Sequence, residues 1–230
     1  MPAPLDLNTP TALILIDNQS AFCQPDTLSY WGNGRSNPQY EVNIQALITA
    51  FRAALSSSST FMEVIHIFHS SVTPGSLLHP YHPNNGIHPL DFATPASDGS
   101  EPVFWKSVNS SFIGTDLEAH LREKGIRQII IAGLTTDHCV STTVRMAANL
   151  GVVDRLLGEG PVNIKPDGTH VKDVLVEKGR IILVQDATAT FGKGGFDAET
   201  VHAVSVASLD GEFCEAMNAE DVVKALRSAI

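Results

Sequence analysis

Residues Ile129 to Val140 read IIIAGLTTDHCV, a run of β-branched residues followed by a glycine and a small polar turn. This pattern is typical of a buried strand, expected over Gln128 to Ala132, that leads directly into a helix, expected over Ser141 to Leu150. Such a turn places the Cys139 thiol at the carboxyl edge of a sheet and at a helix N-terminus. Because the positive end of the helix dipole favours the thiolate, Cys139 is a candidate nucleophile.

Similar strand patterns occur on both sides of this segment. Thr11 to Ile16 is a continuous apolar run that ends at Asp17, as expected for a parallel strand buried on both faces. Further strands are expected over Met62 to Phe68, Val103 to Trp105 and Arg180 to Val184. Helical patterns cover residues 42–55, 115–124, 197–217 and 219–230. The alternation predicts an α/β fold in which helices flank a parallel sheet.

The helix expected over residues 115–124 carries recognisable end signals. Thr115 is in the N-cap position, Glu118 is in the capping-box position three residues later, and Gly125 is in the C-cap position. These residues predict a helix that begins at Thr115 and ends before Gly125.

Two long segments interrupt the alternation. Between Ser70 and Pro102 the chain is rich in Pro, Gly, His and Asn, and such a long irregular stretch is typical of a lid or pocket wall. Residues 154–179 exceed the usual connection of about 2–6 residues, so we interpret them as an insertion, with a short helix expected over Val171 to Glu177. Because no internal repeat is visible, residues 1–230 are expected to form one domain.

The composition excludes several classes of partner. The formal net charge of −10 and the dispersed Lys and Arg residues argue against binding to nucleic acid. No stretch approaches the roughly 20 apolar residues that cross a bilayer, so no membrane association is expected. The first residues lack a secretory signal, which predicts a cytoplasmic protein. Its three cysteines, Cys23, Cys139 and Cys214, are widely spaced and are expected to be reduced.

Three polar residues follow strand-like segments, namely Asp17, Lys106 and Cys139. Parallel sheets bind ligands outside the carboxyl ends of their strands, so we expect these side chains to converge. Asp17 can take the thiol proton, Lys106 can stabilise negative charge, and Cys139 can attack a carbonyl carbon. The turn before Cys139 can present backbone N–H groups to the resulting oxyanion.

Three ordered motifs resemble those of the isochorismatase-like cysteine hydrolases: residues 15–22 (LIDNQSAF), 106–112 (KSVNSSF) and 132–140 (AGLTTDHCV). The resemblance runs from about Thr11 to Met217 and leaves residues 154–179 unmatched. It implies a three-layer, Rossmann-like fold with a mainly parallel six-stranded sheet, a triad of Asp17, Lys106 and Cys139, and a homo-oligomer, either a dimer or a tetramer. It also implies a cis peptide between Leu134 and Thr135, and an oxyanion hole formed by the amides of Thr135 and Cys139.

Members of this family differ in the bond that they cleave. Several use the cysteine to hydrolyse amide-type bonds, whereas some isochorismatases split a vinyl ether and lack that cysteine. Cys139 is present here, and a nucleophile that forms a thioester benefits acyl transfer more than vinyl-ether hydrolysis. The prediction is a hydrolase that acts on a small amide-type substrate. Two alternatives remain open: isochorismate hydrolysis, and a binding or effector module that uses residues 154–179 and has no turnover.

Metal binding is not expected, and neither is a cofactor. Nicotinamidases, which belong to the same family, bind a metal through an Asp-x-His pair and a further His, but this chain has His69-Ser70-Ser71 in the corresponding place. His79, His82 and His88 could in principle form a metal site. Their irregular, proline-rich spacing favours loop histidines that bind no metal, and nicotinamide is not expected to be the main substrate.

The remaining site predictions concern contacts with the substrate. The candidates are Gln19, Phe22, Trp105, Phe112, Thr136 and His138, with Asn109 as a further polar contact and Trp31, Tyr81 and Phe191 as further aromatic ones. Each aromatic residue could equally belong to the core. His138 adjoins the nucleophile, but neighbouring helical residues point in different directions, so Asp17 is the preferred base.

Overall fold

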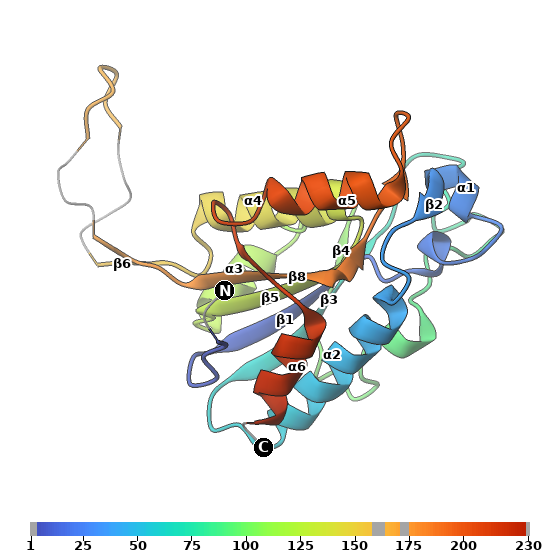
Figure 1. Ribbon diagram of the computed structural model, residues 1–230. Helices are drawn as coiled ribbons and strands as arrows, with labels where there is room; N and C mark the ends of the chain where they lie inside the picture. Colours follow the sequence, from blue (N-terminus) through green and yellow to red (C-terminus); the bar gives the residue numbers. More distant parts are fainter. Residues whose placement is uncertain (1–3, 158–163, 171–174, 229–230) are drawn as a thin grey trace.

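Runs of β-branched residues build the centre of the protein, a sheet of six parallel strands (Figure 1). The computed structural model describes residues 4–157, 164–170 and 175–228. The strand order is β10-β8-β5-β1-β3-β4, which confirms the predicted six-stranded fold. The strands are β1 (Thr11–Ile16), β3 (Met62–His69), β4 (Val103–Lys106), β5 (Gln128–Leu134), β8 (Arg180–Ala189) and β10 (Glu215–Met217).

Helices cover both faces of this sheet, so the fold has three layers (Figure 1). On one face, α2 (Tyr40–Leu55) and α6 (Ala219–Arg227) pack on a cluster that includes Leu13 and Leu15 of β1. On the other face, the alternate residues of β1 pack against α3 (Leu117–Glu123), α4 (Ser141–Leu150) and α5 (Ala198–Ala207). Successive side chains of a β-strand point to opposite faces of the sheet. Because helices cover both faces, the side chains on each face of β1 are buried.

Short elements complete the structure around the carboxyl edge of the sheet. They are η1 (Ser20–Phe22), α1 (Leu28–Trp31), β2 (Asn33–Arg35), η2 (Asp91–Ala93), η3 (Thr136–Val140) and β9 (Phe191–Gly192). β2 and β9 pair in an antiparallel manner outside the main sheet. Within the described residues, no helix is long and apolar enough to cross a membrane.

The sixth strand lies inside a segment for which the sequence predicted one long helix. The expectation of a helix over residues 197–217 is wrong in its second half, because α5 ends at Ala207 and β10 follows at Glu215. Arg180, at the start of β8, holds β10 in place through an ion pair of 2.7 Å with Glu215. A strand of only three residues has too little periodicity to be distinguished from a helix by its pattern.

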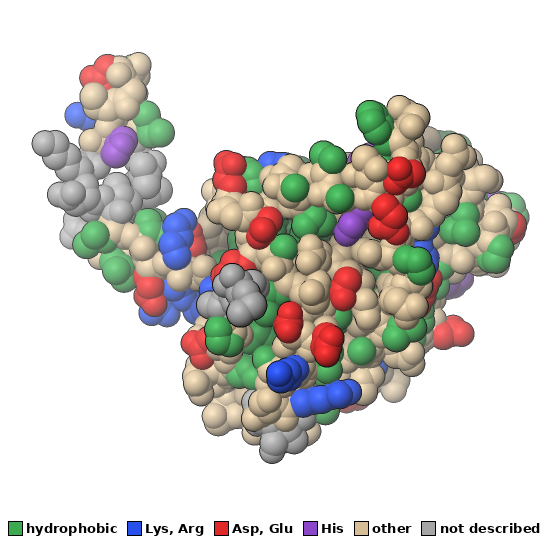
Figure 2. All heavy atoms as spheres, in the orientation of Figure 1, with side chains coloured by type: hydrophobic (Ala, Val, Ile, Leu, Met, Phe, Trp, Pro, Cys, Tyr) green, Lys and Arg blue, Asp and Glu red, His purple; other side chains and the backbone are tan. Residues whose placement is uncertain are grey.

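Residues 154–179 contain a two-stranded ribbon that extends away from the sheet (Figure 1). Its described strands are β6 (Arg155–Leu156) and β7 (Val176–Glu177). The helix predicted over Val171 to Glu177 falls partly on residues 171–174, which lie outside the described residues, and its described end is a strand instead. Hydrophobic and charged side chains both appear along the described part of the ribbon (Figure 2).

The ribbon is closed at its base by contacts with the body. The backbone N–H of Gly179 donates to Asp154 Oδ1 at 3.0 Å, and Arg127 donates to the carbonyl oxygens of Val153 and Glu177. A Cβ atom on Gly179 would lie 2.1 Å from the Val153 carbonyl oxygen, so the two ends of the ribbon meet at a position that only glycine fits.

The capping box predicted for α3 does not form. The helix begins at Leu117, and Glu118 pairs with Arg122 one turn later instead of reaching back to the cap. Thr115 donates its hydroxyl to the Ser111 carbonyl oxygen, which competes with the capping geometry. The predicted end is confirmed, because Gly125 adopts a positive φ of 65° directly after the C-cap residue Lys124.

Candidate active site

Four strands end at the same edge of the sheet, and each brings one polar side chain to it. Asp17 follows β1, His69 ends β3, Lys106 ends β4, and Cys139 lies in the turn after β5. His69 and Lys106 are direct partners in the register of β3 and β4. Because β1 lies between β3 and β5, the order of the strands brings these residues together although 122 positions separate Asp17 from Cys139 (139 − 17).

Lys106 is the centre of this cluster. Its Nζ donates to Asp17 Oδ2 at 2.7 Å, to His69 Nδ1 at 3.1 Å and to Cys139 Sγ at 3.3 Å. Burial alone would lower the pKa of Lys106, but the attraction of Asp17 and Cys139 outweighs it and raises the pKa above its ordinary value. The side chain is therefore a buried ammonium with three N–H groups and three acceptors.

The Asp17 carboxylate divides its two oxygens between different environments. Oδ2 accepts from Lys106, whereas Oδ1 is buried and has no hydrogen-bond partner among the residues that the structure describes. The ligand atoms of Asp17 and Cys139 lie within 4.8 Å of each other. Asp17 thus offers an unoccupied acceptor beside the thiol.

Cys139 differs from the sequence expectation in its ionisation. Burial raises the pKa of the thiol, the nearby Asp17 carboxylate raises it further, and Lys106 opposes the rise. The expectation that the helix N-terminus alone would favour a thiolate is therefore corrected, because the sulfur is desolvated and faces a carboxylate. Burial and the Asp17 carboxylate thus favour the thiol, and the proton of that form must go to an acceptor when the sulfur attacks.

The turn that carries Cys139 is a single π-helical turn, η3, between β5 and α4. The peptide between Leu134 and Thr135 is cis, as the family resemblance implied. The Thr135 N–H donates to no acceptor among the described residues. Because Thr135 borders the same cavity as Cys139, its amide is a candidate donor to an oxyanion.

A cavity of about 150 Å³ opens beside the sulfur. Its lining combines aromatic and aliphatic side chains with a few polar ones, as is usual for small-molecule sites. The lining residues are Phe22, Trp31, His69, Ser76, Leu78, Asn109, Thr135, His138, Cys139, Phe191 and Lys193. Phe22 and Trp31 stack with their ring centroids 4.4 Å apart and form one aromatic wall. Ser76 and Leu78 come from the irregular segment 70–102, which the sequence predicted to border the site.

Among the predicted substrate contacts, Phe22, His138 and Asn109 line this cavity, and so do Trp31 and Phe191. Four other predicted contacts, Gln19, Trp105, Phe112 and Thr136, are engaged elsewhere. Gln19 is fully buried and bonds the main chain of His69, and the Thr136 hydroxyl bonds the His202 ring at 2.9 Å. Trp105 lies half-exposed against Phe68 on the edge strand, and Phe112 packs on the core near α3 and α4.

Two residues of the cavity were missed by sequence reasoning. His69 was considered only as part of an absent metal motif, although it ends a strand just as Lys106 does, and that position was the available signal. Lys193 reaches the cavity from the turn after β9 and pairs with Asp137 at 2.6 Å. Nothing in the pattern around Lys193 predicts this contact, because it depends on the path of the chain after β8.

The site also contains a set of atoms that could bind a metal ion, from Asp17, His69 and Cys139. The Lys106 ammonium donates a hydrogen bond to each of these three residues and so occupies the position that a cation would take. The donor set therefore does not fit a metal while Lys106 is in place. In the loop, the Nδ1 atoms of His79 and His82 accept backbone N–H groups two residues later in the chain.

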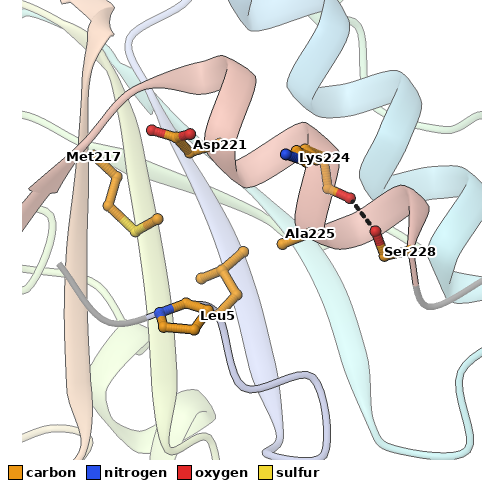
Figure 3. A pocket seen from close by; sticks show the side chains of 7 residues that line it. Leu5, Met217, Asp221, Lys224, Ala225 and Ser228 are labelled. Carbon is orange, nitrogen blue, oxygen red and sulfur yellow. Dashed lines mark hydrogen bonds between the residues drawn. The ribbon is translucent and has the colours of Figure 1, made fainter. Parts of the chain in front are cut away.

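Larger surface hollows occur away from this cluster. One has a volume of about 480 Å³ and lies between the segment before β1 and helix α6 (Figure 3). Leu5, Met217 and Ala225 form much of its wall, and Asp221 and Lys224 stand at its rim. Its Ser228 hydroxyl donates to the Lys224 carbonyl oxygen, and no histidine or cysteine lines it among the described residues, so its size alone does not make it a catalytic site.

Comparisons with known proteins agree with this geometry. The family model described as the isochorismatase domain matches residues 11–221. This chain belongs to the isochorismatase family. Family protein YrdC of Bacillus subtilis strain 168, itself uncharacterized, is 35% identical over 217 residues, which cover 92% of this chain and 94% of YrdC. The nicotinamidase/pyrazinamidase of Mycobacterium tuberculosis is 30% identical over 178 residues, covering 69% of this chain and 89% of that enzyme.

Solved structures extend the similarity to the whole isochorismatase fold. An isochorismatase-family protein from Chromobacterium violaceum superimposes with a TM-score of 0.74 at 34% identity, covering 99% of this chain and all of the other. A cysteine hydrolase from Pseudomonas syringae has a TM-score of 0.72 at 23% identity, covering 100% of this chain and 97% of the other, and it shows the shared fold alone. The buried cluster of Asp17, Lys106 and Cys139 is consistent with the catalytic triad of this family.

Proposed function

We propose that this isochorismatase-family chain hydrolyses a small amide-type substrate through a thioester on Cys139. The observation that carries the proposal is the arrangement around the thiol. Lys106 contacts the sulfur, and the unpartnered Oδ1 of Asp17 is buried close to it. A nucleophile, a base and a cation within hydrogen-bonding range form the set that acyl transfer requires.

The reaction begins when Cys139 Sγ attacks the carbonyl carbon and its proton passes to Asp17. The carbonyl oxygen becomes an oxyanion, which the amides of Thr135 and Cys139 stabilise. The C–N bond then breaks, and the leaving nitrogen takes the proton from Asp17. Water adds to the thioester while Asp17 accepts one of its protons, and that proton returns to the sulfur as the C–S bond breaks. The net change is one amide plus water to one acid plus one amine.

Two further observations favour amide hydrolysis over vinyl-ether cleavage. The nucleophile is present and faces the cavity, whereas protonation of a vinyl ether needs an acid and no thiol. The relative from Mycobacterium tuberculosis is named for two amide substrates. The small volume of the cavity supports a compact substrate whose apolar part lies against Phe22 and Trp31.

Intact-mass analysis tests the proposal. The protein is incubated with a panel of small amides and with isochorismate, and the reaction is quenched in acid to preserve any thioester. We expect an acyl adduct on Cys139 with at least one amide, and neither adduct nor turnover in Cys139→Ala. Cys214→Ala is the matched control, since Cys214 is similarly buried but lies directly before β10 and does not line the cavity beside Cys139.

The outcomes separate the alternatives. Turnover by Cys139→Ala contradicts covalent catalysis. Turnover of isochorismate without an adduct supports vinyl-ether hydrolysis instead. Failure of every compound to react, with binding retained, supports a binding module that does not catalyse.

We also propose that the chain forms a homo-oligomer, either a dimer or a tetramer. Leu156, Leu157 and Leu175 on the ribbon are all exposed, and apolar side chains gathered in this way are typical of interaction surfaces. Light scattering after size exclusion should give a multiple of the 24.6 kDa chain mass. Leu157→Ser should shift the mass toward the monomer, and a wild-type monomer contradicts the proposal.

A further inference from the structure

The main chain of His69 is held by a single buried side chain. Gln19 Oε1 accepts the His69 N–H at 2.8 Å, and Gln19 Nε2 donates to the His69 carbonyl oxygen at 2.9 Å. The same Nε2 also donates to the Ile87 carbonyl oxygen at 2.7 Å. Because Gln19 is fully buried and both N–H groups of its amide are bonded, the segment that follows β1 fixes the position of His69.

The imidazole of His69 has two distinct sides. A lysine ammonium can only donate, so the contact of 3.1 Å with Lys106 makes Nδ1 the acceptor. Burial lowers the pKa of His69, and the positive charge of Lys106 lowers it further, while Asp17 opposes both. The ring is therefore neutral with its proton on Nε2, which has no hydrogen-bond partner among the described residues.

We propose that His69 is a positioning residue for Lys106, and that its Nδ1 holds the ammonium in the orientation that keeps one N–H on Cys139 Sγ. The ammonium can rotate about its bond to the side chain, and Asp17 and Cys139 supply only two acceptors for three N–H groups. Without Nδ1, the third N–H would be buried and unpaired, which is unfavourable. The ammonium would then turn toward the cavity or water, at the expense of its contact with the sulfur.

This role rests on the proposed function, because Lys106 matters to catalysis only if Cys139 reacts. The test therefore measures the thiol directly and needs no substrate. Iodoacetamide alkylates the thiolate, so its rate at each pH reports how strongly the site stabilises negative charge on sulfur. Digestion and mass spectrometry separate Cys139 from Cys23 and Cys214, which serve as internal references.

Two substitutions of similar polarity distinguish the role of Nδ1 from that of Nε2. His69→Asn places an amide at the δ position, where its oxygen can still accept from Lys106. His69→Gln moves the amide to the ε position and removes the acceptor from Lys106. We expect the alkylation rate of Cys139 in His69→Asn to stay within about threefold of wild type, and in His69→Gln to fall about tenfold.

The pH profile from pH 6 to 10 completes the test. In His69→Gln the profile should move to higher pH by about one unit, which corresponds to the tenfold loss at a fixed pH. Equal rates in both variants overturn the proposal, whether both match wild type or both are slow. Circular dichroism and the alkylation of Cys23 and Cys214 show whether either variant has lost its fold. If Cys139→Ala retains turnover, the proposed function fails, yet the comparison of Asn with Gln still decides the role of His69.

Discussion

Lys106 and Asp17 form a fully buried ion pair, 2.7 Å from Nζ to Oδ2, in which only one carboxylate oxygen takes part. The other oxygen, Oδ1, has no partner among the described residues. The pair therefore fixes the carboxylate while leaving it one free acceptor. Asp17 can therefore keep its ion pair with Lys106 through Oδ2 while Oδ1 receives a proton.

Asp17→Asn should remove that acceptor with little change in shape. We expect kcat to fall by about 10²–10⁴-fold, the usual contribution of a general base. Stability should fall by about 3–5 kcal/mol, because Lys106 loses its partner while still buried. Kinetics on the substrate identified by acyl trapping, together with urea unfolding, measure both effects. Asp186→Asn, a carboxylate outside the site, is the control, and a kcat within tenfold of wild type for Asp17→Asn would contradict its role.

Lys106→Ala should create a metal site. Removing the ammonium leaves ligand atoms from Asp17, His69 and Cys139 within 4.8 Å of one another, and these residue types suit zinc. Isothermal titration with zinc should show one bound ion per chain in Lys106→Ala and none at this site in wild type. The double variant Lys106→Ala with His69→Ala should lose this binding. Equal zinc binding in both variants would place the metal elsewhere.

Gly133→Ala should be severely destabilising. Gly133 has a φ of 127°, and an added Cβ would lie 2.0 Å from the carbonyl oxygen of Ile16 on the neighbouring strand. Relief of this clash must move β1 or β5, so we expect a loss above about 3 kcal/mol. Gly114 has a φ of 71°, and a Cβ added there would meet no atom within 4 Å. Gly114→Ala should therefore lower the free energy of unfolding by only about 1–2 kcal/mol. Chemical denaturation measures the free energy of unfolding of both variants. Similar losses of stability in the two would show that β1 and β5 adjust freely.

Stability should decrease as the pH falls from about 7 to 5. Burial lowers the pKa of His66, His69 and His202 from an ordinary value of 6.5. Below that value the unfolded chain binds protons that the folded chain does not, so the unfolded state is favoured. Burial would raise the pKa of Glu101, but its hydrogen bonds with Arg52 and His66 outweigh this effect and lower the pKa to about 2. The ionised Glu101 therefore loses its stabilising effect only below about pH 4.5.

Thermal unfolding measures this window. Each 1 kcal/mol lowers the Tm of a chain of this size by roughly 2–4 °C, so the three histidines together should lower it by several degrees. His202→Gln should flatten the dependence, and His88→Gln, on an exposed loop, is the comparison variant for a histidine substitution outside the core. A Tm that is constant over this range would show that these histidines do not titrate with folding.

Much of the fold followed from local pattern. The apolar runs of β1, β3 and β5 are long and uninterrupted, so their type and order were predictable. β10 was not, because three residues carry too little periodicity and its place depends on pairing with β8. The ribbon strands were missed for the same reason, since two residues on each side pair only with each other.

In the site, the residues that the sequence predicted correctly are reactive side chains that follow the end of a strand. Asp17, Lys106 and Cys139 each follow such an end, and the structure brings them together. Gln19 follows one as well, yet its side chain turns back to bond His69, and no local signal distinguishes a substrate contact from an internal one. The protonation of Cys139 was also beyond sequence reasoning, because it depends on how deeply the sulfur is desolvated.

The closed base of the ribbon has a consequence for how this protein can change. Val153 and Gly179 meet at the sheet, so the chain beyond them begins and ends at nearly one point. A change in the length of a loop whose two ends already meet has little effect on the free energy of folding. Such a change also leaves the strands of the sheet in place. The segment is therefore a natural place for insertions and deletions to accumulate during evolution, and an attachment point at which a reporter or affinity tag can be grafted while Cys139 keeps its surroundings.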